Sequence, residues 1–175
     1  YFQDTEQMPI HHKDYNPYVE AFWEWWPELY KTLKVFRVTG GEPLVDKNTW
    51  KVLDYVIENP NPELELCFNT NGCVPDTAMD RFIDKMKDIT TNNKIGLTRV
   101  YTSVDTDGKQ AEFIRYGLDY NQLFNNIDRI LTELPKVTIV VMSTFNIFSP
   151  FNYEKLVRKI YDYKVKHFNT NRYWN

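Results

Sequence analysis

The feature that most constrains this chain is a repeated alternation of short apolar stretches with longer amphipathic ones. The short stretches predict strands at residues 35–39, 64–69, 97–104 and 137–142. Residues 137–142 are continuously apolar, which is typical of a parallel strand buried on both faces. Strands that alternate with helices predict βαβ units with right-handed crossovers. The expected fold class is therefore α/β with a parallel sheet.

The longer stretches place apolar residues at helical spacing. Predicted helices begin near Pro17, at Asp46 or Asn48, at Asp76, near Asp119 and near Tyr153. We expect the first helix to be kinked or restarted at Pro27. The last helix, to about Tyr163, is expected to turn Leu156, Val157, Ile160 and Tyr161 inward. Residues 113–117 are interpreted as part of a connecting stretch.

Length and charge limit the classes of protein that this chain can belong to. The chain has 175 residues and is 42% hydrophobic, which suffices for the core of one domain. We expect residues 1–16 to form an extended lead-in and residues 17–175 to form the α/β domain. The net charge of −3, with both signs mixed along the chain, argues against a nucleic-acid or membrane partner. No apolar run approaches the length of a membrane span.

The cysteines and histidines suggest no metal site by themselves. Cys67 and Cys73 are too few for a disulfide framework, which favours a reducing compartment, the cytoplasm. We interpret Cys67 as a core residue and Cys73 as a loop thiol. His11 and His12 could bind a metal, but adjacent histidines without a third ligand are more often solvated. Because the sequence begins with Tyr1, we expect it to be an internal piece of a longer chain.

A sharp turn follows the first predicted strand. Gly40 and Gly41 allow positive φ and a close approach of the backbone to a ligand, and Pro43 rigidifies the exit. Glu42 adds a carboxylate at the end of the strand. Backbone carbonyls with one carboxylate suit a ligand ammonium group. The alternative is a plain connection from strand to helix, in which the glycines serve only the turn.

Polar residues follow every predicted strand. They are Gly40 to Glu42, Asn69 to Gly72, Ser103 with Asp105, and Ser143 to Asn146. In parallel α/β proteins the carboxyl ends of the strands share one edge of the sheet, and ligands bind there. The sequence therefore predicts a binding site at that edge.

The order and intervals of these turns resemble a known family. The stretches are Thr39-Gly40-Gly41-Glu42-Pro43-Leu44, Asn69-Thr70-Asn71-Gly72, Ser103-Val104-Asp105 and Phe113-Ile114-Arg115-Tyr116-Gly117. Together they resemble the core of the radical S-adenosylmethionine (radical SAM) enzymes, most closely the branch with a SPASM or twitch extension. The resemblance covers about Phe36 to Tyr163.

The resemblance implies a partial (β/α)6 barrel that holds S-adenosylmethionine and a 4Fe-4S cluster. In that family an electron cleaves a carbon–sulfur bond of S-adenosylmethionine, and the resulting 5′-deoxyadenosyl radical abstracts a hydrogen atom from the substrate. The protein supplies position and shielding for this chemistry. The implied partners are an electron donor and a substrate, for which a peptide or protein is the candidate.

The resemblance also assigns candidate cofactor-binding residues. It places the methionine ammonium at the turn of Thr39, Gly40, Gly41, Glu42 and Pro43. Ser103 would face the ribose and carboxylate, with Asp105 as its companion, and Arg115 would grip the carboxylate. Asn71 would face the same cavity, and Val141 and Thr144 would contact the adenine.

Simpler roles compete with these assignments. Arg115 could form an ordinary surface ion pair, and Ser103 could cap a helix or turn. Residues 70–72 could form only a turn. No catalytic acid or base is singled out by the sequence.

One part of the family pattern is missing. The family's cluster is held by a Cys-x3-Cys-x2-Cys loop upstream of the glycine turn, and residues 1–39 contain no cysteine. In one hypothesis the ligands lie upstream of Tyr1, the chain is truncated at both ends, and by itself it is inactive. In the other hypothesis a cluster-less barrel binds a peptide or protein through exposed aromatic residues, for which Trp23, Trp25, Trp26 and Trp174 are candidates.

Overall fold

The computed structural model describes residues 15–168. His11, His12, Trp174 and most of the predicted lead-in lie outside the described residues. The chain divides into two compact units, residues 1–33 and residues 34–175, and each is described by itself. The predicted boundary between residues 16 and 17 stays a prediction.

The described part of the first unit is dominated by helix α1 (Pro17–Thr32). Asn16 caps it, because its side chain accepts hydrogen bonds from the amides of Tyr18 and Val19. The helix runs through Pro27 without a break, so the predicted restart does not occur. Trp26 and Tyr30 are buried, and their rings lie 5.5 Å apart.

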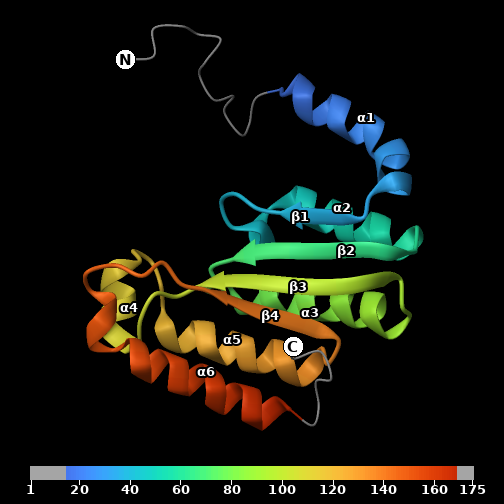
Figure 1. Cartoon of the computed structure of the whole chain (residues 1–175). Coiled ribbons are helices and arrows are strands. Elements are labelled where there is room, and N and C mark those ends of the chain that lie inside the picture. Colours follow the sequence, from blue (N-terminus) through green and yellow to red (C-terminus); the bar gives the residue numbers. More distant parts are fainter. Residues whose placement is uncertain (1–14, 169–175) are drawn as a thin grey trace, which may run out of the picture. The chain divides into compact units, whose positions relative to one another are not determined.

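The second unit is built on a four-stranded sheet in the order β1-β2-β3-β4. The strands are β1 (Val35–Val38), β2 (Asn61–Thr70), β3 (Ile95–Ser103) and β4 (Val137–Met142). Every neighbouring pair is parallel, and the arrows point to the side on which α4 lies (Figure 1). The α/β fold class with a parallel sheet is therefore confirmed. β2 starts earlier than predicted, because the Asn61 amide donates to the carbonyl of Lys94, 2.7 Å away.

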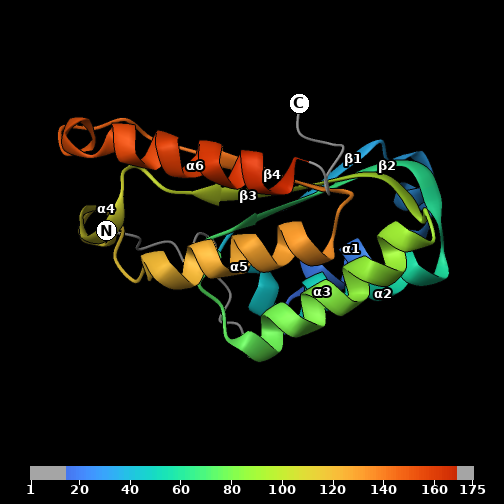
Figure 2. The ribbon, with the colours of Figure 1, turned by 90° about the horizontal axis from the view of Figure 1, so that it is seen from below.

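Helices follow the strands in turn. They are α2 (Lys47–Glu58), α3 (Asp76–Thr91), α4 (Gly108–Ile114), α5 (Tyr120–Glu133) and α6 (Tyr153–His167), with short 3-10 turns η2 (Pro43–Val45) and η3 (Ser149–Phe151). α2, α3 and α5 lie on the same side of the sheet, with α3 between the other two (Figure 2). α4 was expected to be part of a connection. It is only 7 residues long, and Ala111 is its one buried residue, so its sequence carries too little apolar periodicity.

The core lies between the sheet and these helices. Phe68 of β2 meets Phe82 of α3 edge to face, with ring centroids 5.2 Å apart. Successive side chains of a strand alternate between the two faces, so Glu65, Cys67 and Asn69 point to the opposite face of the sheet. We call that opposite face the inner face.

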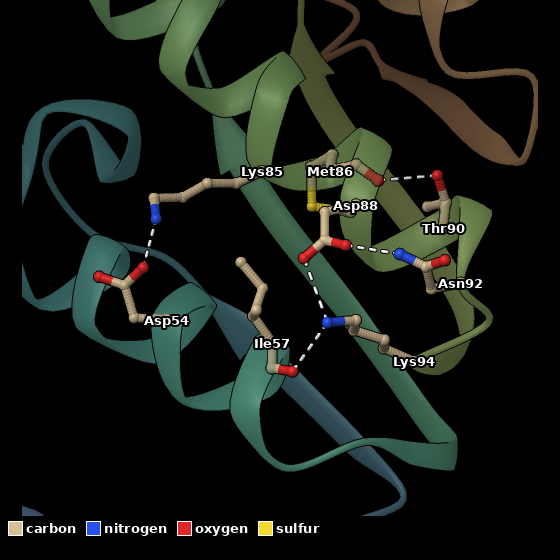
Figure 3. Close-up of polar contacts among 8 residues, drawn as sticks. All are labelled: Asp54, Ile57, Lys85, Met86, Asp88, Thr90, Asn92 and Lys94. Atoms are coloured by element: carbon tan, nitrogen blue, oxygen red, sulfur yellow. Dashed lines mark hydrogen bonds and ion pairs between the residues drawn. The ribbon is translucent and has the colours of Figure 1, made fainter.

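Polar contacts fix α2 against α3 and the start of β3 (Figure 3). The Lys94 ammonium donates to the carbonyl of Ile57 at 2.9 Å and pairs with Asp88 at 3.1 Å. Lys85 of α3 pairs with Asp54 of α2. The C-terminal carbonyl of α2 is therefore satisfied by a side chain that also joins α3.

The last strand and helix are less buried than the sequence predicts. Leu156 of α6 is buried, but Val157 is 48% exposed and Tyr161 is 64% exposed, so their predicted inward orientation is wrong. The expectation that β4 is buried on both faces is also wrong, because residues 140–142 are only half-buried. β4 is the end strand of the sheet in the described chain, and α6 therefore has fewer neighbours to pack against. Within residues 15–168, no helix has the length and apolarity needed to cross a bilayer.

Candidate functional site

A cavity of about 240 Å³ opens at the C-terminal edge of the sheet. Its walls come from the ends of all four strands and from the segment that joins α4 to α5. The lining residues are Thr39, Gly40, Gly41, Asn69, Thr70, Asn71, Tyr101, Ser103, Arg115, Tyr116, Gly117, Leu118 and Met142. The turns after β1, β2 and β3 thus meet at one place, as predicted, whereas β4 contributes Met142 and the predicted residues Ser143 to Asn146 do not line the cavity.

The glycine turn leaves room for a ligand. Gly40 has φ +90° and Gly41 has φ +57°, a region that other residues enter only with strain. A Cβ atom added at either position would meet no atom within 4 Å. The backbone of this turn is therefore open to a molecule in the cavity.

Glu42 connects the first two strand-end turns. Its Oε1 accepts hydrogen bonds from the Leu44 amide at 3.1 Å and the Thr70 hydroxyl at 2.6 Å. Its Oε2 accepts one from the Asn71 amide at 2.8 Å. A carboxylate oxygen accepts about two hydrogen bonds, so Oε2 retains capacity for a ligand donor while Oε1 does not. Pro43 is buried beside Glu42 at the start of η2.

The second turn contributes an unsatisfied acceptor. The side-chain Oδ1 of Asn69 is buried and has no hydrogen-bond partner in the described chain, although Asn69 lines the cavity. A buried acceptor without a partner is costly, and a ligand donor would satisfy it. Asn71 differs, since its Oδ1 already accepts from the Cys73 amide at 2.8 Å.

Asp105 and Arg115 form an ion pair behind the cavity. Arg115 Nη2 donates to Asp105 Oδ1 at 3.0 Å, and Arg115 Nε lies 2.7 Å from Oδ2. The Asp105 side chain is 4% exposed, and the Arg115 side chain is 34% exposed. Oδ1 of Asp105 also accepts from the Thr144 amide at 2.7 Å, which ties the turn after β4 to the one after β3. Arg115 thus reaches the cavity from a fixed position.

The cavity contains part of the predicted set. Predicted residues in its walls are Thr39, Gly40, Gly41, Asn71, Ser103 and Arg115. Glu42, Pro43, Asp105 and Thr144 do not line it. Glu42 braces Asn71 and Asp105 braces Arg115, both of which are wall residues, whereas the Thr144 amide bonds to Asp105. Val141 lines a different hollow, between β4 and α6.

Sequence reasoning missed several wall residues. Tyr101 and Met142 are the missed residues whose positions are easiest to explain. Tyr101 lies two residues before Ser103 on the same face of β3, and Met142 pairs with Ser103 in the sheet register. Strand alternation from Ser103 was the signal that could have found them. Leu118 is also part of the wall, and no motif marks it.

The residues described here do not fit a 4Fe-4S cluster. The Cys67 thiol is buried and donates to Glu65 at 3.2 Å, and the Cys73 thiol donates to the Asp119 carbonyl at 3.2 Å. Burial raises the pKa of both thiols, which opposes the thiolate form that binds iron. In residues 15–168 no group of three His, Cys, Asp or Glu side chains is arranged to hold a metal ion.

A four-stranded parallel sheet that alternates with helices is an α/β fold consistent with a partial (β/α) barrel. The Radical SAM superfamily matches residues 6–167, and the chain belongs to that family. The family consists of enzymes that in general use S-adenosylmethionine and a 4Fe-4S cluster. No curated protein and no solved structure gave a match. The SPASM or twitch branch stays a prediction.

Proposed function

We propose that this chain is the S-adenosylmethionine-binding part of a radical SAM enzyme of the SPASM or twitch type. When bound with its cluster, this cofactor supplies a 5′-deoxyadenosyl radical for hydrogen abstraction. In the proposal, the carbonyls of the Gly40-Gly41 turn accept the methionine ammonium, and Glu42 holds the second turn in place through its hydrogen bonds with Thr70 and Asn71. Ser103 and Arg115 hold the carboxylate, and Asn69 Oδ1 accepts a hydroxyl or ammonium donor.

The observation that carries the proposal is the composition of the cavity wall. It combines an open glycine backbone, an unsatisfied buried acceptor and a braced guanidinium. S-adenosylmethionine presents the matching groups, namely an ammonium, a carboxylate and ribose hydroxyls. Thr144 would act through the hydrogen bond that its backbone amide donates to Asp105, not by direct contact with the adenine.

The test is titration of S-adenosylmethionine into the chain by isothermal calorimetry. Ser103→Ala removes a hydroxyl from the cavity wall, and we expect about tenfold weaker binding, the equivalent of one hydrogen bond. Ser143→Ala is the matched control, because Ser143 is an exposed serine at the end of the neighbouring strand and does not line this cavity. Its affinity should equal that of the wild type. Equal losses in the two variants, or no binding to the wild-type chain, would contradict the proposal.

We further propose that the cluster ligands come from outside residues 1–175. Both cysteines of the chain are engaged in other contacts, so the chain alone is expected not to cleave S-adenosylmethionine. The native reading frame upstream of Tyr1 should encode a Cys-x3-Cys-x2-Cys loop. The protein expressed from that longer reading frame and reconstituted anaerobically should contain iron and acid-labile sulfide. Their absence would refute this part of the proposal. A reducing compartment, the cytoplasm, fits the two unpaired thiols.

A cluster-less module that binds a peptide or protein is the second candidate. Several large apolar side chains are exposed on α4, on the connection that follows it, and on the connection from β4 to α6: Phe113, Tyr116, Phe145, Ile147, Phe148 and Phe151. Exposed apolar groups gathered in neighbouring segments favour contact with an apolar partner. A reading frame without the cysteine loop, together with no binding of S-adenosylmethionine, would favour this function. The same residues would contact a peptide substrate if the enzyme hypothesis holds.

A further inference from the structure

The inner face of the sheet contains an arginine, Arg37, that pairs with no carboxylate of residues 15–168. The sheet register pairs Arg37 of β1 with Cys67 of β2, and Cys67 with Arg99 of β3, so these side chains form one row on one face. Arg99 forms an ion pair with Glu65. In the part of the chain that the structure describes, no ion pair involves Arg37. The row therefore carries an excess positive charge at Arg37.

Arg37 is held next to the cavity. Its guanidinium carbon lies 4.3 Å from the centroid of the Tyr101 ring, a cation–π contact. Tyr101 lines the cavity, and so does Thr39, which follows Arg37 by two residues on the same face. Two residues of a strand span about 7 Å. Arg37 is exposed and does not itself line the cavity, and its contact with Tyr101 places the cation beside one of the cavity walls.

The surroundings of Arg37 suit an anion more than an apolar group. Cys67, beside it in the row, is completely buried under its neighbours and offers no negative charge, since burial raises the pKa of its thiol. Glu65, an inner-face carboxylate of the neighbouring strand β2, is committed to Arg99 and to the Cys67 thiol. A planar guanidinium binds a carboxylate through two parallel hydrogen bonds, and the adjacent ring can cover the carbon chain that carries it.

We infer that Arg37 and Tyr101 form a subsite for a carboxylate group of the substrate, on the inner-face side of the cavity. This inference rests on the proposed function, because it assumes that the cofactor occupies the cavity and the substrate lies beside it. The substrate class that follows is a molecule with a carboxylate near the hydrogen that is abstracted. For a peptide, that carboxylate is an acidic side chain or the C-terminus.

The test compares phenylacetate with its neutral analogue phenylacetamide, each titrated into the full chain and followed by ligand-observed NMR. We expect the wild type to bind phenylacetate more tightly than phenylacetamide. Arg37→Gln should weaken phenylacetate binding about tenfold or more, and Arg37→Lys, which keeps the charge but not the planar fork, should weaken it less. Arg158→Gln is the control, because it removes an equal charge from an exposed helix position and should change nothing.

The outcomes separate this inference from the proposed function. Equal phenylacetate affinity in the wild type and in Arg37→Gln, or equal affinity of the wild type for both probes, overturns the subsite. Titration of S-adenosylmethionine into the wild type is the separate test of the proposed function. If S-adenosylmethionine does not bind but phenylacetate binding depends on Arg37, the chain has an anion site and the proposed function is wrong. If circular dichroism shows that Arg37→Gln is unfolded, Arg37→Lys and the comparison of the two probes decide the question.

Discussion

Replacement of Gly72 by alanine tests the packing beneath the candidate site. Gly72 has φ +71°, and a Cβ atom added there would lie 2.5 Å from Cδ1 of Leu123. The left-handed conformation costs alanine about 1–2 kcal/mol. Because Leu123 is fully buried, the forced shift of its side chain adds about 1–3 kcal/mol of overpacking. We therefore expect Gly72→Ala to lower the free energy of unfolding by about 2–5 kcal/mol.

Gly108→Ala is the matched control for this prediction. Gly108 has φ +60°, but a Cβ atom there would meet nothing within 4 Å, so only the backbone cost of about 1–2 kcal/mol applies. Urea unfolding followed by circular dichroism measures both variants. In the double variant Gly72→Ala/Leu123→Ala, the added methyl group has room. The double variant should therefore lose less free energy of unfolding than the sum of the losses in the two single variants. Equal losses for the two glycines, or simple additivity in the double variant, would refute the steric argument.

Four further predictions concern three polar contacts and the reactivity of Cys67. Lys94→Ala should lower the free energy of unfolding by about 1.5–3 kcal/mol, because it removes the partner of two groups and its side chain is only 17% exposed. Lys34→Ala breaks an exposed pair and should barely change the urea midpoint. Asp105→Asn should weaken S-adenosylmethionine binding in calorimetry and reduce stability, since Arg115 loses the charge that holds it; unchanged affinity would argue against bracing. The folded protein should resist alkylation of Cys67 by iodoacetamide at neutral pH, because its thiol is fully buried and burial also raises the thiol pKa. Mass spectrometry of the labelled peptide, with and without urea, measures this, and rapid labelling without urea would contradict it.

The sequence predicted the general location of the candidate site but not the contacts within it. Gly40, Gly41 and Ser103 were found because turn residues and strand ends leave local signals, and the structure places them in the cavity wall. The position of Glu42 was also predicted. The hydrogen bonds that Glu42 accepts from Thr70 and Asn71 were not predicted, because they join residues that are 28 and 29 positions apart in the sequence. Local patterns carry no information on such pairings.

The last helix shows the same limit for packing. Its apolar spacing predicted a helix from Tyr153, and the structure has α6 begin there. Which apolar residues are covered depended on its neighbours, and Tyr161 remained exposed at the end of the sheet. Periodicity identifies an amphipathic face, but burial requires a second element to pack against that face.

The sequence by itself determined the alternation of strands and helices, the parallel sheet and the glycine turn at the edge of that sheet. These follow from side-chain periodicity, turn chemistry and the handedness of βαβ units, which act over short stretches of chain. Only the tertiary structure decided that Asp105 holds Arg115, that Asn69 Oδ1 is left without a partner, and that Arg37 lies over Tyr101. Charged and hydrogen-bonding groups pair with partners that are near in the folded chain. The register of β1, β2 and β3 sets that nearness for Arg37 and Tyr101, and the packing of the connections sets it for Asp105 and Arg115.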